Sequence, residues 1–335
     1  MDDPHSDGDA HDVELRLPYR PPLAIGALIG FLAPRAVPGV EQVVGSEYQR
    51  VLRLPGGPAV VALRAEDAGA APRRDGDRGA DAGGSPDRER SAESGGPPGH
   101  GDAGGSAPLI RCRLRRADPR DEAQAVGACR RLLDLDADPG AVDGALGDDP
   151  ALAPLVAATP GRRAPGHVDA GELAIRAVLG QQVSLAAARG LAARLAELCG
   201  EPLPAPAGTL TRAFPSPAAI AEADLDHIGM PGARRATLRA LATALADGTI
   251  DLAPGAPADE AEARLLELRG VGPWTASYIR MRGLGDPDVL LDTDLGVRHA
   301  LTRLGLAGCD DLAGRWRPWS SYAVHHLWAS LGRVV

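Results

Sequence analysis

From about residue 119 onward, the chain is a succession of short segments with helical periodicity, each closed by glycine or proline. Apolar residues recur at three- and four-residue spacing in 121–135, 169–200, 216–229, 233–248, 259–270, 273–283, 294–306 and 318–332. Such periodicity between Gly or Pro stops predicts amphipathic helices with short connections, and the long stretch 169–200 is expected to break near Gly180. We therefore expect an all-helical domain over 119–335, without an internal repeat of fixed period.

The first third of the chain has a different pattern. Residues 22–37 have helical periodicity, whereas 47–54, 59–65 and 109–116 are short runs rich in β-branched and other apolar residues, typical of strands. Residues 66–107 are rich in Gly, Ala, Asp, Arg and Pro without an apolar period, which predicts a disordered insert in a hairpin loop, where long insertions cost little. The fold class is therefore α+β: a small antiparallel-sheet domain over 15–118, followed by the helical domain.

The formal charge of −9 is unevenly distributed along the chain. Residues 1–14 contain six acidic groups and no basic one, which leaves only −3 for the remainder. We expect this acidic tail to be disordered. Because the remainder is nearly balanced, the net charge does not exclude a nucleic-acid partner and predicts only modest non-specific affinity for one.

The composition also bears on the cellular location of the protein and on which cofactors it could bind. No apolar run approaches the roughly 20 residues of a membrane span, and the acidic N-terminus is unlike a secretory signal, so we expect a cytoplasmic protein with no membrane partner. The four cysteines, Cys112, Cys129, Cys199 and Cys309, are far apart and form no C-x2-C pair. The sequence therefore predicts neither a zinc site nor an iron–sulfur cluster, and no cofactor.

The chain contains no lysine, so all 36 of its basic residues are arginine. A GC-rich coding bias would explain this together with the excess of Ala, Gly and Pro. The chemical consequence holds regardless of the cause. No side-chain amine is available to form a Schiff base with a substrate.

A tight turn, Gly270-Val271-Gly272, lies between two amphipathic segments, and Pro273 opens the second. Glycine permits positive φ and a close approach of the backbone, so the turn amides can point at one anion, and the positive end of the next helix faces the same way. A phosphate is the natural ligand of this helix-hairpin-helix arrangement, which holds nucleic-acid backbones independently of sequence. A helix–helix turn without any ligand is the alternative.

From this turn through 289–301 the sequence resembles the helix-hairpin-helix base-excision glycosylases, in which Gly-Val-Gly precedes a helix and an aspartate opens the next. Segments 174–195, 228–238, 315–328 and 29–44 resemble the bacterial 3-methyladenine DNA glycosylase II (AlkA-type) family. The resemblance covers nearly the whole chain except the acidic tail and the insert. It places the helix-hairpin-helix at 261–282 and the start of the catalytic helix within 292–304. It implies a monomeric enzyme whose partner is double-stranded DNA containing alkylated bases.

The residue behind the turn separates two reaction types within this superfamily. In the bifunctional members, the position two after the second glycine is a lysine that attacks the sugar and permits strand cleavage. Here that position is Trp274, and the chain contains no lysine that could replace it. The resemblance and the composition together predict a monofunctional glycosylase that uses water and leaves an abasic site.

The family's base pocket is lined by aromatic residues. The matching positions here are Phe31, Trp274, Tyr278 and Trp328. Aromatic faces attract cationic N-alkylpurines by about 0.5–2 kcal/mol when desolvated, and they hold a flipped base by stacking. A plain core role is the alternative, most plausibly for Phe31. Some relatives have an aromatic residue directly after the catalytic aspartate, where this chain has Leu295.

Two carboxylates precede the segment 295–305, and either could cap its helix. A carboxylate near the anomeric carbon would stabilise the positive charge that develops on the sugar and orient the attacking water. In the family, the catalytic aspartate precedes an Arg-Leu-Gly-like helix end by a fixed interval, which selects Asp294 by counting back from 303–305. A superficial match to the bifunctional enzymes would select Asp292 instead. We expect Asp294 to be catalytic, with Asp292 or Thr293 as the cap.

The resemblance assigns further residues to DNA. It implies that Gln182 fills the gap left by the flipped nucleotide, and that the hairpin binds the backbone through Gly270, Val271, Gly272 and Thr275. Arg280 and Arg282 add backbone contacts or lie on a solvated face. No metal site made of side chains is expected, and His325 and His326 are interpreted as packing or surface residues. In relatives, a monovalent cation is held by hairpin carbonyls, here those of Leu266, Arg269 and Val271.

Two other functions are considered beside the glycosylase. One is a non-catalytic helix-hairpin-helix module that binds alkylated DNA, which would not need Asp294 at its register. The other is a bifunctional glycosylase/lyase for oxidised bases, which the missing lysine and the missing cysteine cluster oppose.

Overall fold

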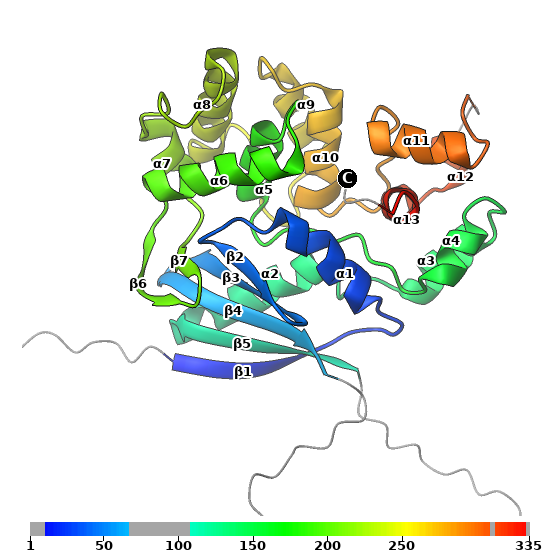
Figure 1. Ribbon diagram of the computed structural model, residues 1–335, viewed down its shortest axis with the longest axis horizontal. Coiled ribbons are helices and arrows are strands. Elements are labelled where there is room, and N and C mark those ends of the chain that lie inside the picture. Colours follow the sequence, from blue (N-terminus) through cyan, green and yellow to red (C-terminus); the bar gives the residue numbers. More distant parts are fainter. Residues whose placement is uncertain (1–10, 67–107, 309–311, 333–335) are drawn as a thin grey trace, which may run out of the picture.

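The computed structural model describes residues 11–66, 108–308 and 312–332 (Figure 1). Most of the predicted acidic tail (1–10) and of the predicted insert (67–107), together with Cys309, lies outside the described residues. Within those residues, no helix combines the length and the apolar character needed to cross a membrane.

A five-stranded antiparallel sheet forms the N-terminal part. Its strands are β1 (His11–Pro18), β2 (Glu41–Val44), β3 (Glu47–Leu54), β4 (Gly57–Ala65) and β5 (Leu109–Ala117), in the order β1-β5-β4-β3-β2. Strands β4 and β5 are neighbours, with Ala65 opposite Ile110. The chain between them therefore connects the two arms of a hairpin, as predicted for the insert.

The prediction of a disordered tail through residue 14 was wrong for its last residues. Residues 11–14 lie in β1, which pairs with β5 along the sheet edge. The sequence contains the signal: apolar Val13, Leu15 and Leu17 alternate with charged residues, and the charged side chains are exposed. Alternation of period two is the mark of a half-buried strand, which the acidic composition concealed.

Two helices cover one face of the sheet, α1 (Ile25–Leu32) and α2 (Glu122–Leu133). Buried residues of α2, among them Cys129 and Leu132, share a hydrophobic core with sheet residues such as Leu63 and Leu114. The predicted boundary at 118 therefore separates α2 from the sheet on which it packs. Short 3₁₀ turns, Ala33–Arg35 and Pro119–Asp121, follow α1 and precede α2.

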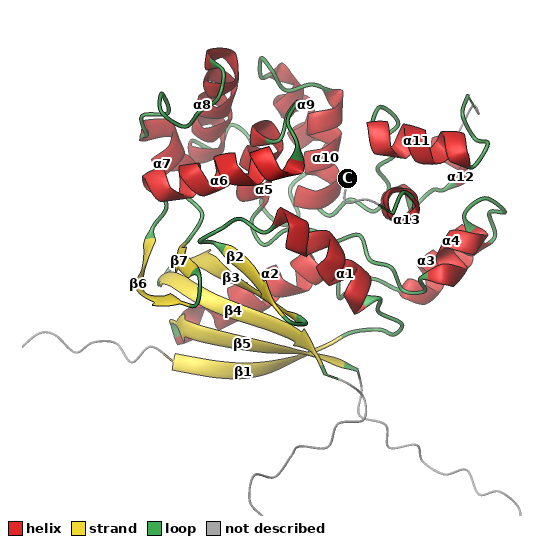
Figure 2. Cartoon of the chain, viewed as in Figure 1, coloured by secondary structure: helices red, strands yellow, loops and turns green. Residues whose placement is uncertain are grey.

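The remaining helices gather on the other side of α1 from the sheet (Figure 2). They are α3 (Pro139–Gly147), α4 (Ala153–Ala158), α5 (Ala170–Leu179), α6 (Leu185–Cys199), α7 (Pro217–Glu222), α8 (Gly232–Ala246), α9 (Ala258–Glu267), α10 (Pro273–Gly283), α11 (Leu295–Arg303), α12 (Leu312–Arg315) and α13 (Ser320–Ser330). The predicted break near Gly180 is confirmed, because α5 ends at Leu179 and Ser184 caps α6. The sequence analysis did not identify α3 and α4.

The helical part is not free of strands. A two-stranded ribbon, β6 (Pro202–Ala207) and β7 (Leu210–Arg212), follows α6. Leu203 and Leu210 are buried against Val51 and Val60 of the large sheet. The ribbon thus joins the helical part to the sheet, and proline-rich residues 202–207 offered no alternation to reveal it.

Two separate hydrophobic cores hold the helices. One is shared by α5, α6, α8 and α10 and includes Val178, Leu195, Leu241 and Ile279. The other is shared by α3, α4, α11 and α13 and includes Trp316. Tyr278, on α10, packs against both cores. The site described next lies where the two cores meet, on the side of α1.

Candidate functional site

Helices α9 and α10 form a helix-turn-helix hairpin around 268–272. Gly270 has φ +94°, a conformation that L side chains rarely adopt, and a Cβ placed on it would lie 2.2 Å from the hydroxyl oxygen of Thr237. That hydroxyl donates to the carbonyl oxygen of Arg269 across 2.9 Å. Glycine is therefore required at position 270 both by its φ and by the close approach of α8.

The predicted DNA contacts of the hairpin differ in how accessible they are. Gly270 is exposed, whereas the side chains of Val271 and Thr275 are buried. Val271 belongs to a hydrophobic core, and the Thr275 hydroxyl accepts a hydrogen bond from Gln181 Nε2 across 3.1 Å. The turn therefore presents its backbone to the outside. The side chains of Val271 and Thr275 pack inside the protein.

The turn leaves backbone donors open. Val271 N–H donates to the carbonyl of Leu268 at 3.0 Å, and Gln181 Nε2 donates to the carbonyl of Gly270 at 2.9 Å. Within the described part of the chain, the N–H groups of Gly270 and Gly272 have no hydrogen-bond partner. Together with the N-terminus of α10, they form a group of donors suited to one anionic oxygen.

Asp294 lies at the start of α11 and is its N-cap. Its Oδ1 accepts from the N–H of Val297 at 2.8 Å, and the residue is 8% exposed. Asp292 is exposed and does not line the cavity described below. The prediction that Asp292 or Thr293 caps this helix was wrong, because Asp294 has that role itself.

Two indoles hold the Asp294 carboxylate from different helices. Trp274 Nε1 on α10 donates to Oδ2 at 3.0 Å, and Trp328 Nε1 on α13 donates to Oδ1 at 2.9 Å. Charge-assisted hydrogen bonds of this kind are roughly twice as strong as neutral ones and fix orientation. The carboxylate is therefore held in place before any ligand arrives.

A cavity of about 210 Å³ opens in front of this carboxylate. Trp274, Tyr278, Trp328 and Asp294 line it, together with residues from α5, α6 and the 32–41 segment. Trp274 and Tyr278 stack with ring centroids 5.2 Å apart and an interplanar angle of 9°. A cavity with flat aromatic walls and a single carboxylate suits a planar heterocycle.

Four arginines line the same cavity, Arg35, Arg176, Arg189 and Arg282. Arg282 is buried and donates to the carbonyls of Pro165 and Gly166 and to the Tyr278 hydroxyl, each at 2.9 Å. Burial alone would raise the pKa of Tyr278, but Arg282 and Arg35 outweigh it and lower that pKa. The sequence analysis had not placed any of these guanidinium groups in the cavity.

Phe31 lies apart from the other predicted pocket residues. It stacks on Trp328 with centroids 6.2 Å apart, and the Arg35 guanidinium lies 3.8 Å from its ring centroid. Phe31 lines an adjacent cavity that shares Arg35 and Trp328 with the first one. The structure thus brings Trp274, Tyr278, Trp328 and Asp294 together, with Phe31 one layer further away.

Two exposed residues flank the cavity mouth. Gln182 is exposed and has φ +55° in the loop between α5 and α6, next to Val183, which lines the cavity. Leu295, directly after Asp294, is 70% exposed. An exposed large apolar side chain beside a buried carboxylate is suited to contact with a ligand rather than to the core.

Arg280 and Arg282 are not on a solvated face that could hold phosphates. Arg280 pairs with Asp259 at 2.6 Å, Glu262 at 2.9 Å and Asp286 at 2.6 Å, so its charge is already neutralised. Arg282 points inward. His325 and His326 are buried on α13, so they are not the surface residues that the sequence left as one alternative.

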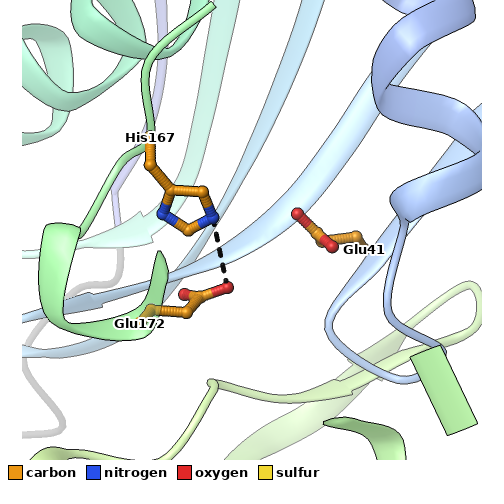
Figure 3. Close-up of side chains that lie close together, drawn as sticks. All are labelled: Glu41, His167 and Glu172. Carbon is orange, nitrogen blue, oxygen red and sulfur yellow. Dashed lines mark ion pairs between the residues drawn. The ribbon is translucent and has the colours of Figure 1, made fainter. Parts of the chain in front are cut away.

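A metal-like cluster, Glu41, His167 and Glu172, lies deeper at the junction between the sheet and α5 (Figure 3). Both carboxylates are already paired with guanidinium groups: Arg50 contacts Glu41 at 3.1 Å and Glu172 at 2.7 Å, and Arg176 contacts both at 3.0 Å. Burial, followed by Arg50 and Arg176, lowers the pKa of His167 well below 6.5. The cluster is a buried network of ion pairs that joins β2 and β3 to α5. The two guanidinium groups already balance the charge of the two carboxylates, so a metal cation is not required for charge balance.

Comparisons with known proteins agree with this arrangement. A model of the AlkA N-terminal domain matches residues 14–73 and 101–169, and a model of the HhH-GPD superfamily base excision DNA repair proteins matches residues 175–313. The chain is 33% identical over 319 residues to DNA-3-methyladenine glycosylase 2 of Escherichia coli, covering 94% of this chain and 97% of that protein.

Two further comparisons extend the likeness. The chain is 43% identical over 330 residues to a Mycobacterium tuberculosis protein described as "Probable bifunctional transcriptional activator/DNA repair enzyme AlkA" and spans 58% of that relative's length, with 97% of this chain covered. A solved structure of a 3-methyladenine DNA glycosylase from Archaeoglobus fulgidus superimposes with a TM-score of 0.70 at 19% identity, covering 95% of this chain and 97% of that one, and so shares its fold.

Proposed function

The chain belongs to the helix-hairpin-helix superfamily of base-excision DNA repair proteins, in the family of DNA-3-methyladenine glycosylase 2, and from this premise we propose that it is a monofunctional DNA glycosylase that removes alkylated bases. The observation that carries the proposal is the buried Asp294 carboxylate, held by two indoles at the wall of a cavity next to the hairpin.

Asp294 is the catalytic group of this proposal. As the C1′–N bond of a damaged nucleotide lengthens, positive charge develops on the sugar, and the carboxylate stabilises it. The base departs with the bonding electrons of C1′–N. A water oriented by Asp294 adds its oxygen to C1′ and transfers a proton to the Asp294 carboxylate. Because the indole and Val297 N–H groups already fix the carboxylate, little reorganisation is needed during the reaction.

The flipped base would lie against Trp274, Tyr278 and Trp328. Aromatic faces hold any planar base, and they attract the formally cationic 3-methyladenine and 7-methylguanine more than neutral bases. Phe31 supports Trp328 from the second layer. The relatives named above for 3-methyladenine support this substrate class.

The DNA strand would be held by the hairpin and by the loop between α5 and α6. The N–H groups of Gly270 and Gly272 offer donors to a backbone phosphate, and Gln182 takes the space that the flipped nucleotide vacates. Val271 and Thr275 keep this turn in shape from inside. In this proposal the protein acts as a monomer on double-stranded DNA, as the resemblance to its family implies.

The carbonyls of Leu266, Arg269 and Val271 would bind a monovalent cation that stiffens the hairpin. The Arg269 carbonyl accepts the Thr237 hydroxyl and retains a second lone pair for such an ion.

The test is base release from DNA methylated by dimethyl sulfate, measured by mass spectrometry of the free bases. We expect 3-methyladenine and 7-methylguanine from the wild type and none from Asp294→Asn, with abasic sites left in uncut strands. Because the chain has no lysine, borohydride should trap no covalent adduct with DNA. Binding of methylated DNA without release of any base would instead support a non-catalytic binding module.

A further inference from the structure

A second cavity of about 230 Å³ lies between α1, the segment 162–165 and α13. Its wall contains Phe31, Arg35, Arg162, Arg163, His325 and Trp328. Arg35 and Trp328 are common to both cavities, but Trp274, Tyr278 and Asp294 belong only to the first. The second cavity therefore contains charged and polar groups that have no part in the proposed removal of a base.

Arg162 contributes a positive charge without a counter-charge. It makes no hydrogen bond and no ion pair with any residue that the structure describes, and its Nε is buried without a partner. Arg163 is 3% exposed, and its terminal nitrogens donate to the carbonyls of Ala137, Arg20 and Pro22, which are neutral acceptors. Its Nε is also buried without a partner.

His325 adds an unsatisfied polar atom to the same wall. It is 4% exposed, and its Nε2 has no hydrogen-bond partner among the described residues. Its ring meets Phe31 and Trp328 edge-on, with centroids 5.0 and 5.1 Å apart. Burial, followed by the nearby arginines Arg282, Arg35 and Arg162, keeps the pKa of His325 well below 6.5, so the ring is neutral and can donate one N–H.

Leaving these groups unpaired is costly. A buried donor without an acceptor destabilises the fold, and the Nε atoms of Arg162 and Arg163 and the Nε2 atom of His325 are three such buried atoms. An anion in the cavity would supply acceptors for the arginine and histidine nitrogens at once, and guanidinium groups are the preferred partners of phosphate and carboxylate oxygens. A cation would be repelled by the same groups.

We propose that this cavity is a binding site for a phosphate-sized oxyanion, held by Arg162, Arg163 and His325. The site is separate from the base cavity and is connected to it through Trp328, whose ring lines both cavities and whose Nε1 holds Asp294. The oxyanion is either free inorganic phosphate or a phosphate group of bound DNA, since both present the same oxygens.

The test is titration of the full-length protein with inorganic phosphate at low ionic strength. Binding is followed by calorimetry and by the indole N–H resonance of Trp328, which is assigned from its loss in Trp328→Phe. Arg162→Met and His325→Leu are the test variants. Arg120→Met is the matched control, because Arg120 is exposed in the turn before α2 and, among the described residues, its side chain pairs with Asp118 alone.

We expect saturable binding that shifts the Trp328 indole resonance, is weakened at least tenfold in Arg162→Met and His325→Leu, and is unchanged in Arg120→Met. Thermal melting shows whether each variant remains folded, and Arg162→Met should, since Arg162 makes no bond within the described residues. Displacement of phosphate by an undamaged duplex identifies a DNA phosphate as the occupant, and persistence identifies the free anion. The absence of saturable binding to the wild type, or equal binding by all four proteins, would overturn the proposal.

Discussion

Trp274 donates its indole N–H to the Asp294 carboxylate across 3.0 Å, which joins the residue behind the glycine turn to the N-cap of the helix that follows α10. The sequence assigned Trp274 to the wall of the base cavity and Asp294 to the chemistry. Through this hydrogen bond, the Trp274 side chain both lines the cavity and orients the Asp294 carboxylate. The glycine turn, which fixes the start of α10, therefore also fixes the direction of the carboxylate.

Exchange of the Asp294 carboxylate should slow base release strongly. Asp294→Asn keeps a side chain that caps α11 well, so the fold should persist. Because the variant lacks the negative charge and the general base, the rate of excision of 3-methyladenine should fall by about 10²–10⁴-fold. Single-turnover release assays with a matched Asp292→Asn control measure this effect, and loss of activity only in Asp292→Asn would show that the register assignment is wrong.

Removal of either indole donor should slow the reaction without unfolding the site. Trp274→Phe and Trp328→Phe keep an aromatic wall but each removes one hydrogen bond to a charged acceptor, worth about 1.5–3 kcal/mol, and so about 10–100-fold in rate. Trp319→Phe is the control, because Trp319 packs edge-on against Tyr322 away from the cavity. Rates of the two test variants equal to that of Trp319→Phe would contradict a role for the indoles in holding Asp294.

Gly270→Ala should destabilise the hairpin. The residue has φ +94°, and the added Cβ would meet the Thr237 hydroxyl oxygen at 2.2 Å. A non-glycine residue in this region costs about 1–3 kcal/mol, which should appear as a lower melting temperature and weaker DNA binding. Gly272→Ala is matched to it, since nothing lies within 4 Å of its Cβ position. Equal melting temperatures for the two variants would refute the packing argument.

Asp134→Asn should make stability less dependent on pH. Burial raises the pKa of Asp134 to about 6, against the hydrogen bonds from Tyr322 and Ala164 that lower it. The folded protein holds this proton more tightly than the unfolded chain does. The contribution of protonated Asp134 to the free energy of unfolding is therefore fully present below about pH 3.8 and is lost as pH rises through 6. Asn accepts the same hydrogen bonds and tolerates the left-handed backbone at φ 52°.

The measurement is urea unfolding of wild type and Asp134→Asn at pH 4 and pH 7.5. We expect the variant to gain on the order of 1–2 kcal/mol relative to wild type at pH 7.5, a figure reduced for partial exposure, and little at pH 4. A constant difference between the two proteins at both pH values would show that Asp134 has the same protonation behaviour in the folded and unfolded states.

The sequence by itself determined the local features of this protein. Helix stops at glycine and proline located α5 to α11 to within about three residues, except α7, which ends at Glu222 rather than near Gly229. Periodicity and capping are properties of neighbouring residues, which is why the sequence contains them. Gly270 with Pro273 predicted the hairpin, and the absence of lysine argued against an imine. The preference for Asp294 over Asp292 came from the resemblance to the glycosylase family. The alternation in residues 12–17 was present but was hidden by the acidic composition.

Only the tertiary structure decided which of these residues meet. Arg280 and Arg282 are two residues apart on one helix, yet one is neutralised by three carboxylates and the other is buried against Tyr278. The two indoles on Asp294 come from α10 and α13, and α2 packs on the sheet rather than with the helices that follow it. Such contacts depend on how distant helices pack, and the spacing of residues along the chain does not contain that information.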